Sequence, residues 1–106
     1  MQLLFANSQI EKICTSEPAA IKKLGARCAE ILLRRLRQMR DAKDLETLTH
    51  IPGHYHPLTA DRKGQWACRL QGGLRLVFAP GARGEMVIKE ITDPTLTILK
   101  IVDYHH

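Results

Sequence analysis

The sequence predicts a single α+β domain, in which an N-terminal strand and two helices pack on a mainly antiparallel sheet of about four to five strands. The first half of the chain carries apolar residues at three- and four-residue steps, which is typical of amphipathic helices. The second half carries short alternating and β-branched runs between glycines and prolines, which is typical of strands. A length of 106 residues fits one domain over residues 1–106, and a hydrophobic content of 44% suits a globular core.

The chain begins with a short apolar strand at residues 1–6, and a short helix follows at residues 7–16. Ser8 and Glu11 have the spacing of a capping box, and Asn7 is a competing N-cap. The first helix is therefore predicted to start at residue 7 or 8, and either Asn7 or Ser8 could be the capping residue.

A second helix is predicted from Pro18 to Met39, after Thr15 and Ser16 interrupt the first. One face is apolar and must pack on the sheet or on the other helix. Its members are Ile21, Leu24, Cys28, Ile31, Leu32, Leu36 and Met39. The opposite face is basic, with Lys22, Lys23, Arg27, Arg34, Arg37 and Arg40. Simple solvation explains this basic face, and an RNA-facing surface that includes Arg34 and Arg37 is the alternative.

The strand-rich half begins after a short helical turn at residues 42–53 that proline and glycine close. Residues 54–59 form a candidate strand, and residues 64–80 form a hairpin whose tight turn is Gly72-Gly73. A further strand is expected at residues 86–92. The β-branched run at the end predicts the last strand, over residues 95–104.

The charge and the cysteines limit the environment and the partners. Lys and Arg number 16 against 11 Asp and Glu, which gives a net charge of +5 and favours a polyanionic partner such as nucleic acid. A protein that is merely basic and soluble explains the charge equally well. Cys14, Cys28 and Cys68 are odd in number and lack a C-x-x-C pair, so we expect a reducing, cytoplasmic compartment. Neither a signal peptide nor a membrane-spanning run is expected.

Two polar clusters are candidates for chemistry. The first lies in the segment His54, His56, Asp61, Arg62, Lys63 and Trp66, and the second is Asp103-Tyr104-His105-His106 at the end of the chain. Arg75 lies between two leucines of the returning hairpin strand and so faces away from them. If the last strand pairs near the hairpin, the two clusters and Arg75 converge in a basic pocket.

That set of side chains suits the cleavage of RNA without a metal or other cofactor. RNA supplies its own nucleophile, the 2′-OH, so an enzyme needs a proton acceptor, a proton donor and cations for the charge that develops on the phosphate oxygens. Histidine transfers protons near neutral pH, and arginine and lysine stabilise the charge. Trp66 is positioned in the sequence to stack on a base.

Alternatives exist for three of these features. His54 and His56 could bind a metal ion with His105 as third ligand, although the neighbouring arginine and lysine residues would repel a cation. Trp66 could belong to the core. His106, and with it His105, could derive from an expression tag, which leaves Asp103-Tyr104 unexplained.

The segments "YHPLTADRKGQWACRL", "LRLVF" and "IVDYH" occur in this order and cover much of the second half. With them, the chain resembles the RelE/HigB family of bacterial toxin–antitoxin toxins, in particular the HigB-like plasmid maintenance killer proteins. The resemblance implies a RelE-like fold and a ribosome-dependent mRNA interferase that needs no metal. It places His56, Arg75, Asp103, Tyr104 and His105 at the catalytic site and Arg62 and Lys63 in a basic RNA-binding loop.

The resemblance also implies partners. They are the ribosome with its mRNA and a cognate HigA-like helix-turn-helix antitoxin, and DNA would be contacted only through the antitoxin. The resulting prediction is an endoribonuclease that cleaves translated mRNA by attack of the 2′-OH. One rival is a ParE-like inhibitor of DNA gyrase on the same fold, which has no need for these histidines. The other is a catalytically idle member that only binds its antitoxin or RNA.

Overall fold

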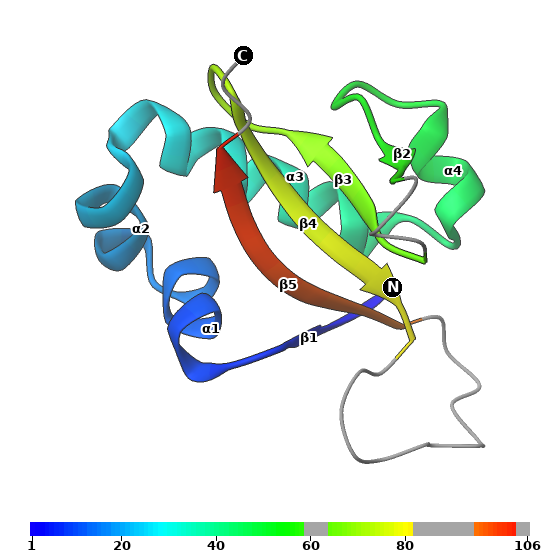
Figure 1. The fold of residues 1–106 in the computed structure, drawn as a ribbon, viewed down its shortest axis with the longest axis horizontal. Coiled ribbons are helices and arrows are strands. Elements are labelled where there is room, and N and C mark those ends of the chain that lie inside the picture. The colour runs from blue at the N-terminus through cyan, green and yellow to red at the C-terminus, as the bar shows by residue number, and fades with distance from the viewer. Residues whose placement is uncertain (59–63, 82–94, 104–106) are drawn as a thin grey trace.

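The computed structural model describes residues 1–58, 64–81 and 95–103. They form one mixed, mostly antiparallel sheet with strand order β1-β5-β4-β3-β2, and helices cover one of its faces (Figure 1). In chain order the elements are β1 (Gln2–Phe5), α1 (Ser8–Thr15), α2 (Glu17–Leu24), α3 (Ala26–Asp41), α4 (Leu45–Thr49), β2 (His56–Pro57), β3 (Trp66–Arg69), β4 (Leu74–Pro80) and β5 (Thr95–Asp103). The predicted α+β fold class is thereby confirmed.

The helical layer differs from the prediction at Gly25. The predicted second helix is in fact two helices, α2 and α3, because Gly25 has φ 87°, a conformation that is open to glycine but not to a continuing helix. The apolar spacing continues across this residue, so periodicity alone does not reveal the break. The predicted interruption before Pro18 is confirmed, since Ser16 ends α1 and caps α2.

The competition for the first helix cap is decided in favour of Asn7. Its side-chain oxygen accepts a hydrogen bond from the backbone nitrogen of Ile10 at 2.9 Å. The same arrangement recurs at α4, where Asp44 accepts from the nitrogen of Thr47 at 2.8 Å. The hydrogen bond from the Thr47 hydroxyl to Asp44, and after it the bond from the Thr47 backbone nitrogen, lowers the pKa of the Asp44 carboxyl.

The sheet is built around the predicted hairpin. β3 and β4 pair antiparallel, β5 pairs antiparallel with β4, and β1 adds to β5 in parallel. The hairpin loop is one residue longer than the predicted Gly72-Gly73 turn, because Leu70 is hydrogen-bonded to Leu74 and residues 71–73 form the loop. Of the candidate strand at residues 54–59, the described part contains the two-residue strand β2, and residue 59 lies outside the described residues. The strand expected at residues 86–92 lies outside the described residues.

The sheet has one apolar face that packs on the helices, which we call the core face. Its buried residues in the strands are Cys68, Leu76, Phe78, Leu96 and Ile98. A bulge preserves this face along β5: Val77 pairs with Lys100 but Phe78 pairs with Ile98, so Leu99 is an extra residue. Ile98 and Ile101 therefore both point to the helices although they are three residues apart.

No helix in the three described ranges is both long and apolar enough to cross a membrane.

Candidate active site

The opposite face of the sheet, which we call the His56 face, gathers basic side chains over a floor of small ones. Pairing places His56 beside Ala67, Ala67 beside Val77, and Val77 beside Lys100, across four strands. The floor residues Ala67, Val77, Ala79 and Thr97 are buried. The basic residues are His56, Arg69, Arg75 and Lys100. Long basic side chains around a floor of small residues form a surface that suits an extended anion.

Arg69 and Arg75 are direct cross-strand partners on this face. Like charges in this position repel each other, and a bound phosphate would relieve the repulsion. His56 is the diagonal neighbour of Arg69, about 7–8 Å away by ordinary sheet geometry. No ion pair joins Arg69 or Arg75 to another described residue; the ion pair seen in those parts of the chain joins Arg34 and Glu30.

Arg75 is half-buried and its guanidinium bends toward the hairpin turn. Its Nη1 donates to the carbonyl oxygens of Gly72 at 3.0 Å and Leu74 at 2.9 Å. The predicted outward orientation, away from Leu74 and Leu76, agrees with its register. Arg69 was not among the predicted site residues. Alternation with Cys68 and Leu70 would have placed Arg69 on the same face as Arg75. Their direct pairing depends on a loop of three residues, 71–73, whereas a two-residue turn at Gly72-Gly73 would have paired Arg69 with Leu76.

His56 has one ring nitrogen committed to the backbone. Its Nδ1 lies 2.9 Å from the carbonyl oxygen of His54. A carbonyl only accepts hydrogen bonds, so this nitrogen carries the proton and, in the neutral ring, Nε2 keeps its lone pair. The histidine is therefore arranged to accept a proton at Nε2.

The segment that carries His56 is anchored in the core through Tyr55. The Tyr55 ring packs edge-on against Phe78, with centroids 6.2 Å apart, and its hydroxyl donates to Oε1 of Gln38 at 2.7 Å. Burial raises the pKa of the Tyr55 phenol well above its usual range, so the hydroxyl remains a donor. Alternation along the strand then directs His56 to the opposite face of the sheet.

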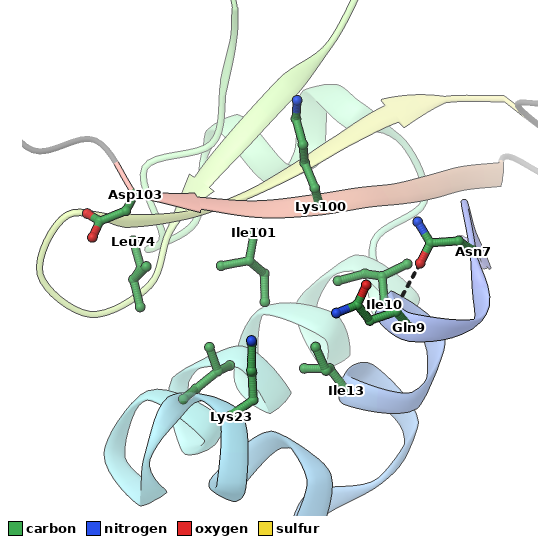
Figure 2. A pocket seen from close by; sticks show the side chains of 10 residues that line it. Asn7, Gln9, Ile10, Ile13, Lys23, Leu74, Lys100, Ile101 and Asp103 are labelled. Carbon is green, nitrogen blue, oxygen red and sulfur yellow. Dashed lines mark hydrogen bonds between the residues drawn. The ribbon is translucent and has the colours of Figure 1, made fainter.

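Asp103 is not brought to the His56 face. It pairs with Leu74, so its register position belongs to the helix-facing side, and it lines a cavity of about 430 Å³ beside α1 and α2. Figure 2 shows Leu74 and Ile101 directed into this cavity, while Lys100 points to the other side of β5. The expected convergence of Asp103 with His56 and Arg75 is therefore not seen in the register of β5.

Six residues of the two predicted clusters lie outside the described residues. They are Asp61, Arg62, Lys63, Tyr104, His105 and His106. Their predicted roles stay predictions. The metal alternative also stays open for this reason: the described residues contain no group of three metal-ligating side chains, and its third ligand was His105.

Trp66 and the helix arginines lie away from the His56 face. Trp66 pairs with Phe78 and packs, partly buried, against the core, which favours the core alternative over stacking on a base. Arg34 and Arg37 are exposed on α3 and line a groove against α2, and Arg34 is 3.6 Å from Glu30. The sheet separates them from His56, which favours the solvated alternative for this helix face.

The three cysteines are free and buried. Burial raises the pKa of Cys14 to about 11 and that of Cys68 to about 12, so neither is a reactive thiolate at neutral pH. All three belong to the hydrophobic core between the helices and the sheet, which accounts for them as packing residues.

No model of a protein family matches the chain, and no curated protein matches its sequence. Among solved structures, a YoeB/ParE toxin from Agrobacterium tumefaciens is similar with a TM-score of 0.64. The match covers 99% of this chain and 100% of that chain at 18% sequence identity. At this identity the likeness shows the fold alone: the chain shares the α+β fold of that toxin structure. The finer HigB-like assignment stays a prediction.

Proposed function

We propose that the protein is the toxin of a bacterial toxin–antitoxin system and that it acts as an endoribonuclease on translated mRNA. The observation that carries this proposal is the His56 imidazole. Its Nδ1 is hydrogen-bonded to the backbone carbonyl of His54, and the His56 side chain lies on the same sheet face as Arg69 and Arg75. This is a proton acceptor beside two phosphate-binding groups, in a protein with a toxin fold.

The reaction begins with the 2′-OH of the substrate. Nε2 of His56 takes the proton from this hydroxyl, and the oxygen attacks the adjacent phosphorus. Arg75 and Arg69 stabilise the charge on the phosphate oxygens, and Arg62 and Lys63 hold the strand. The Cα atoms of His56 and Arg75 are roughly 12 Å apart by strand spacing, a distance that the two side chains span with one phosphate between them.

The leaving 5′ oxygen needs a proton, for which the resemblance offers His105. In the same view Tyr104 orients the 2′-OH or stacks on a base, and Asp103 orients a histidine. Asp103 pairs with Leu74, on the side of the sheet that faces the helices. This position suits a role in orienting a neighbouring residue better than direct contact with the phosphate. No step of this reaction requires a metal ion.

The proposed partners follow from the same function. They are the ribosome with its mRNA in the cytoplasm and a cognate HigA-like antitoxin with a helix-turn-helix domain, through which the complex would bind DNA. Co-purification with the product of the adjacent gene should give a stable complex. A harmless monomer without such a partner would favour the idle-protein rival.

The gyrase-inhibitor rival is kept because the name of the similar structure includes ParE. The two functions differ at His56, which gyrase inhibition does not need. His56→Ala should abolish growth arrest if the protein cleaves RNA and preserve it if the protein inhibits gyrase.

The ends of the cleaved RNA provide the main test. Primer extension and end labelling should show a 2′,3′-cyclic phosphate or 3′-phosphate upstream and a 5′-OH downstream. Cleavage should survive EDTA when the ribosomes are kept intact by other means, and a 2′-deoxy sugar at the cleaved nucleotide should block it. A 5′-phosphate would indicate metal-activated water and would restore His54, His56 and His105 as ligands.

The terminal histidines can be tested separately. His105→Ala should abolish toxicity at equal expression, whereas His106→Ala should have little effect. Full toxicity of the first variant would remove His105 from the mechanism.

A further inference from the structure

His54 has a backbone conformation that its side chain does not favour. Its φ is 56°, and it is the non-glycine residue with positive φ among residues 1–58, 64–81 and 95–103. The left-handed region costs energy for residues with a Cβ, and such residues persist where their surroundings hold them in place. His54 is exposed, so burial of its own side chain does not account for the conformation.

The residues on both sides of His54 hold it there. The carbonyl oxygen of Gly53 accepts from the backbone nitrogen of Arg69 at 2.8 Å, which ties the segment to β3. Gly53 cannot carry a side chain, because a Cβ would lie 2.7 Å from the Tyr55 ring. Tyr55 is anchored on Gln38, as described above. With both neighbours fixed, the turn between them must occur at His54.

The turn directs the His54 carbonyl to the ring of His56. The oxygen is 2.9 Å from Nδ1, and the two imidazole rings are tilted against each other with centroids 4.8 Å apart. A neutral histidine free in water prefers its proton on Nε2, and this hydrogen bond requires the other tautomer. The bond therefore determines which nitrogen can accept a proton.

We propose that His54 is a positioning residue: its left-handed backbone presents its carbonyl to Nδ1 of His56 and so keeps Nε2 of His56 free to accept the substrate's proton. The backbone performs this role and the His54 imidazole does not. The catalytic consequence rests on the proposed function, whereas the tautomer does not.

The tautomer can be measured by ¹⁵N-correlated NMR of the His56 ring at a pH where the ring is neutral and no RNA is present. In the unchanged protein Nδ1 should carry the proton. His54→Gly keeps access to positive φ and should retain this tautomer. His54→Val disfavours positive φ and should shift the proton toward Nε2. His50→Val removes an exposed histidine at a residue with φ −101° and serves as the matched control.

Kinetics give the second readout. His54→Val should lower kcat for RNA cleavage roughly tenfold with KM unchanged, in line with the penalty for a left-handed branched residue, whereas His54→Gly should stay near the parent. A proton on Nε2 in the unchanged protein overturns the proposal, and so does an unchanged tautomer in His54→Val. If His54→Val does not fold, loss of the tautomer in His54→Gly overturns it instead, since the side chain would then be responsible. A protein with the expected tautomers that cuts no RNA would refute the proposed function and leave the positioning role intact.

Discussion

The two faces of the sheet are built from the same strands but obey different rules. The core face buries large apolar side chains against the helices, and Phe78, Leu76 and Ile98 are fully buried there. The His56 face has a floor of small buried residues such as Ala67 and Ala79, with basic side chains around it. The small floor residues do not fill the space above this face. The long basic side chains around them can therefore contact a ligand. Under the proposed function, stability and chemistry are divided between the two faces of one sheet.

The largest expected effect tests the chemical side of this division. His56→Ala should lower the rate of RNA cleavage by about 10²–10⁴-fold, because a proton acceptor is lost. Its stability in urea should change by no more than about 1 kcal/mol, since His56 is only half-buried. Cleavage by this variant at the parental rate would show that His56 is not the proton acceptor.

Removal of a large core-face side chain tests the other side. Phe78→Ala should lower the free energy of unfolding by about 3–5 kcal/mol, because it leaves a cavity beside Tyr55. Arg69→Ala on the His56 face is the matched control and should stay within about 0.5 kcal/mol of the parent. Urea unfolding measures both. Equal losses in the two variants would contradict the division.

Alkaline pH should reveal the buried thiols of the core. The pKa of Cys14 rises from 9.0 to about 11 and that of Cys68 to about 12, so the unfolded chain loses these protons first. The stability that the buried neutral thiols contribute is fully present below pH 9, and it is lost as the pH rises toward their pKa values in the folded protein. The slope is about 1.4 kcal/mol per pH unit for each thiol.

The control for this prediction is the comparison with Cys68→Ala. The variant starts less stable, but its free energy of unfolding should fall less steeply between pH 9 and 11. Parallel pH curves for the two proteins would show that Cys68 ionises equally easily in both states.

The smallest expected effect separates the arginines of the His56 face from those of the helices. For RNA binding, Arg75→Gln should reduce the slope of log K against log salt by about 0.7, the value for one phosphate contact on a single strand. Arg37→Gln should leave the slope unchanged, because this arginine lies in the helical layer beside α2. Equal changes would return Arg34 and Arg37 to the RNA-binding surface.

Structural features that depend only on residues close together in the chain were predictable from the sequence. The hairpin between β3 and β4, the helix break at Ser16 and the apolar stripe of α3 all depend on contacts within a few residues. The α+β class followed from the order of such elements. Arg75 was placed correctly for the same reason, since alternation alone decides the face of a residue inside a regular strand.

What tertiary structure decided depends on residues that are distant in the sequence. The bulge at Leu99 needs the register between β4 and β5, and the place of Asp103 follows from its pairing with Leu74. The left-handed turn at His54 arises only because Arg69 and Gln38, each some 15 residues away or more, hold its two neighbours. Sequence patterns report the preference of each residue for a conformation, whereas a strained conformation exists because other parts of the chain stabilise it, and that energy is visible only in the folded molecule.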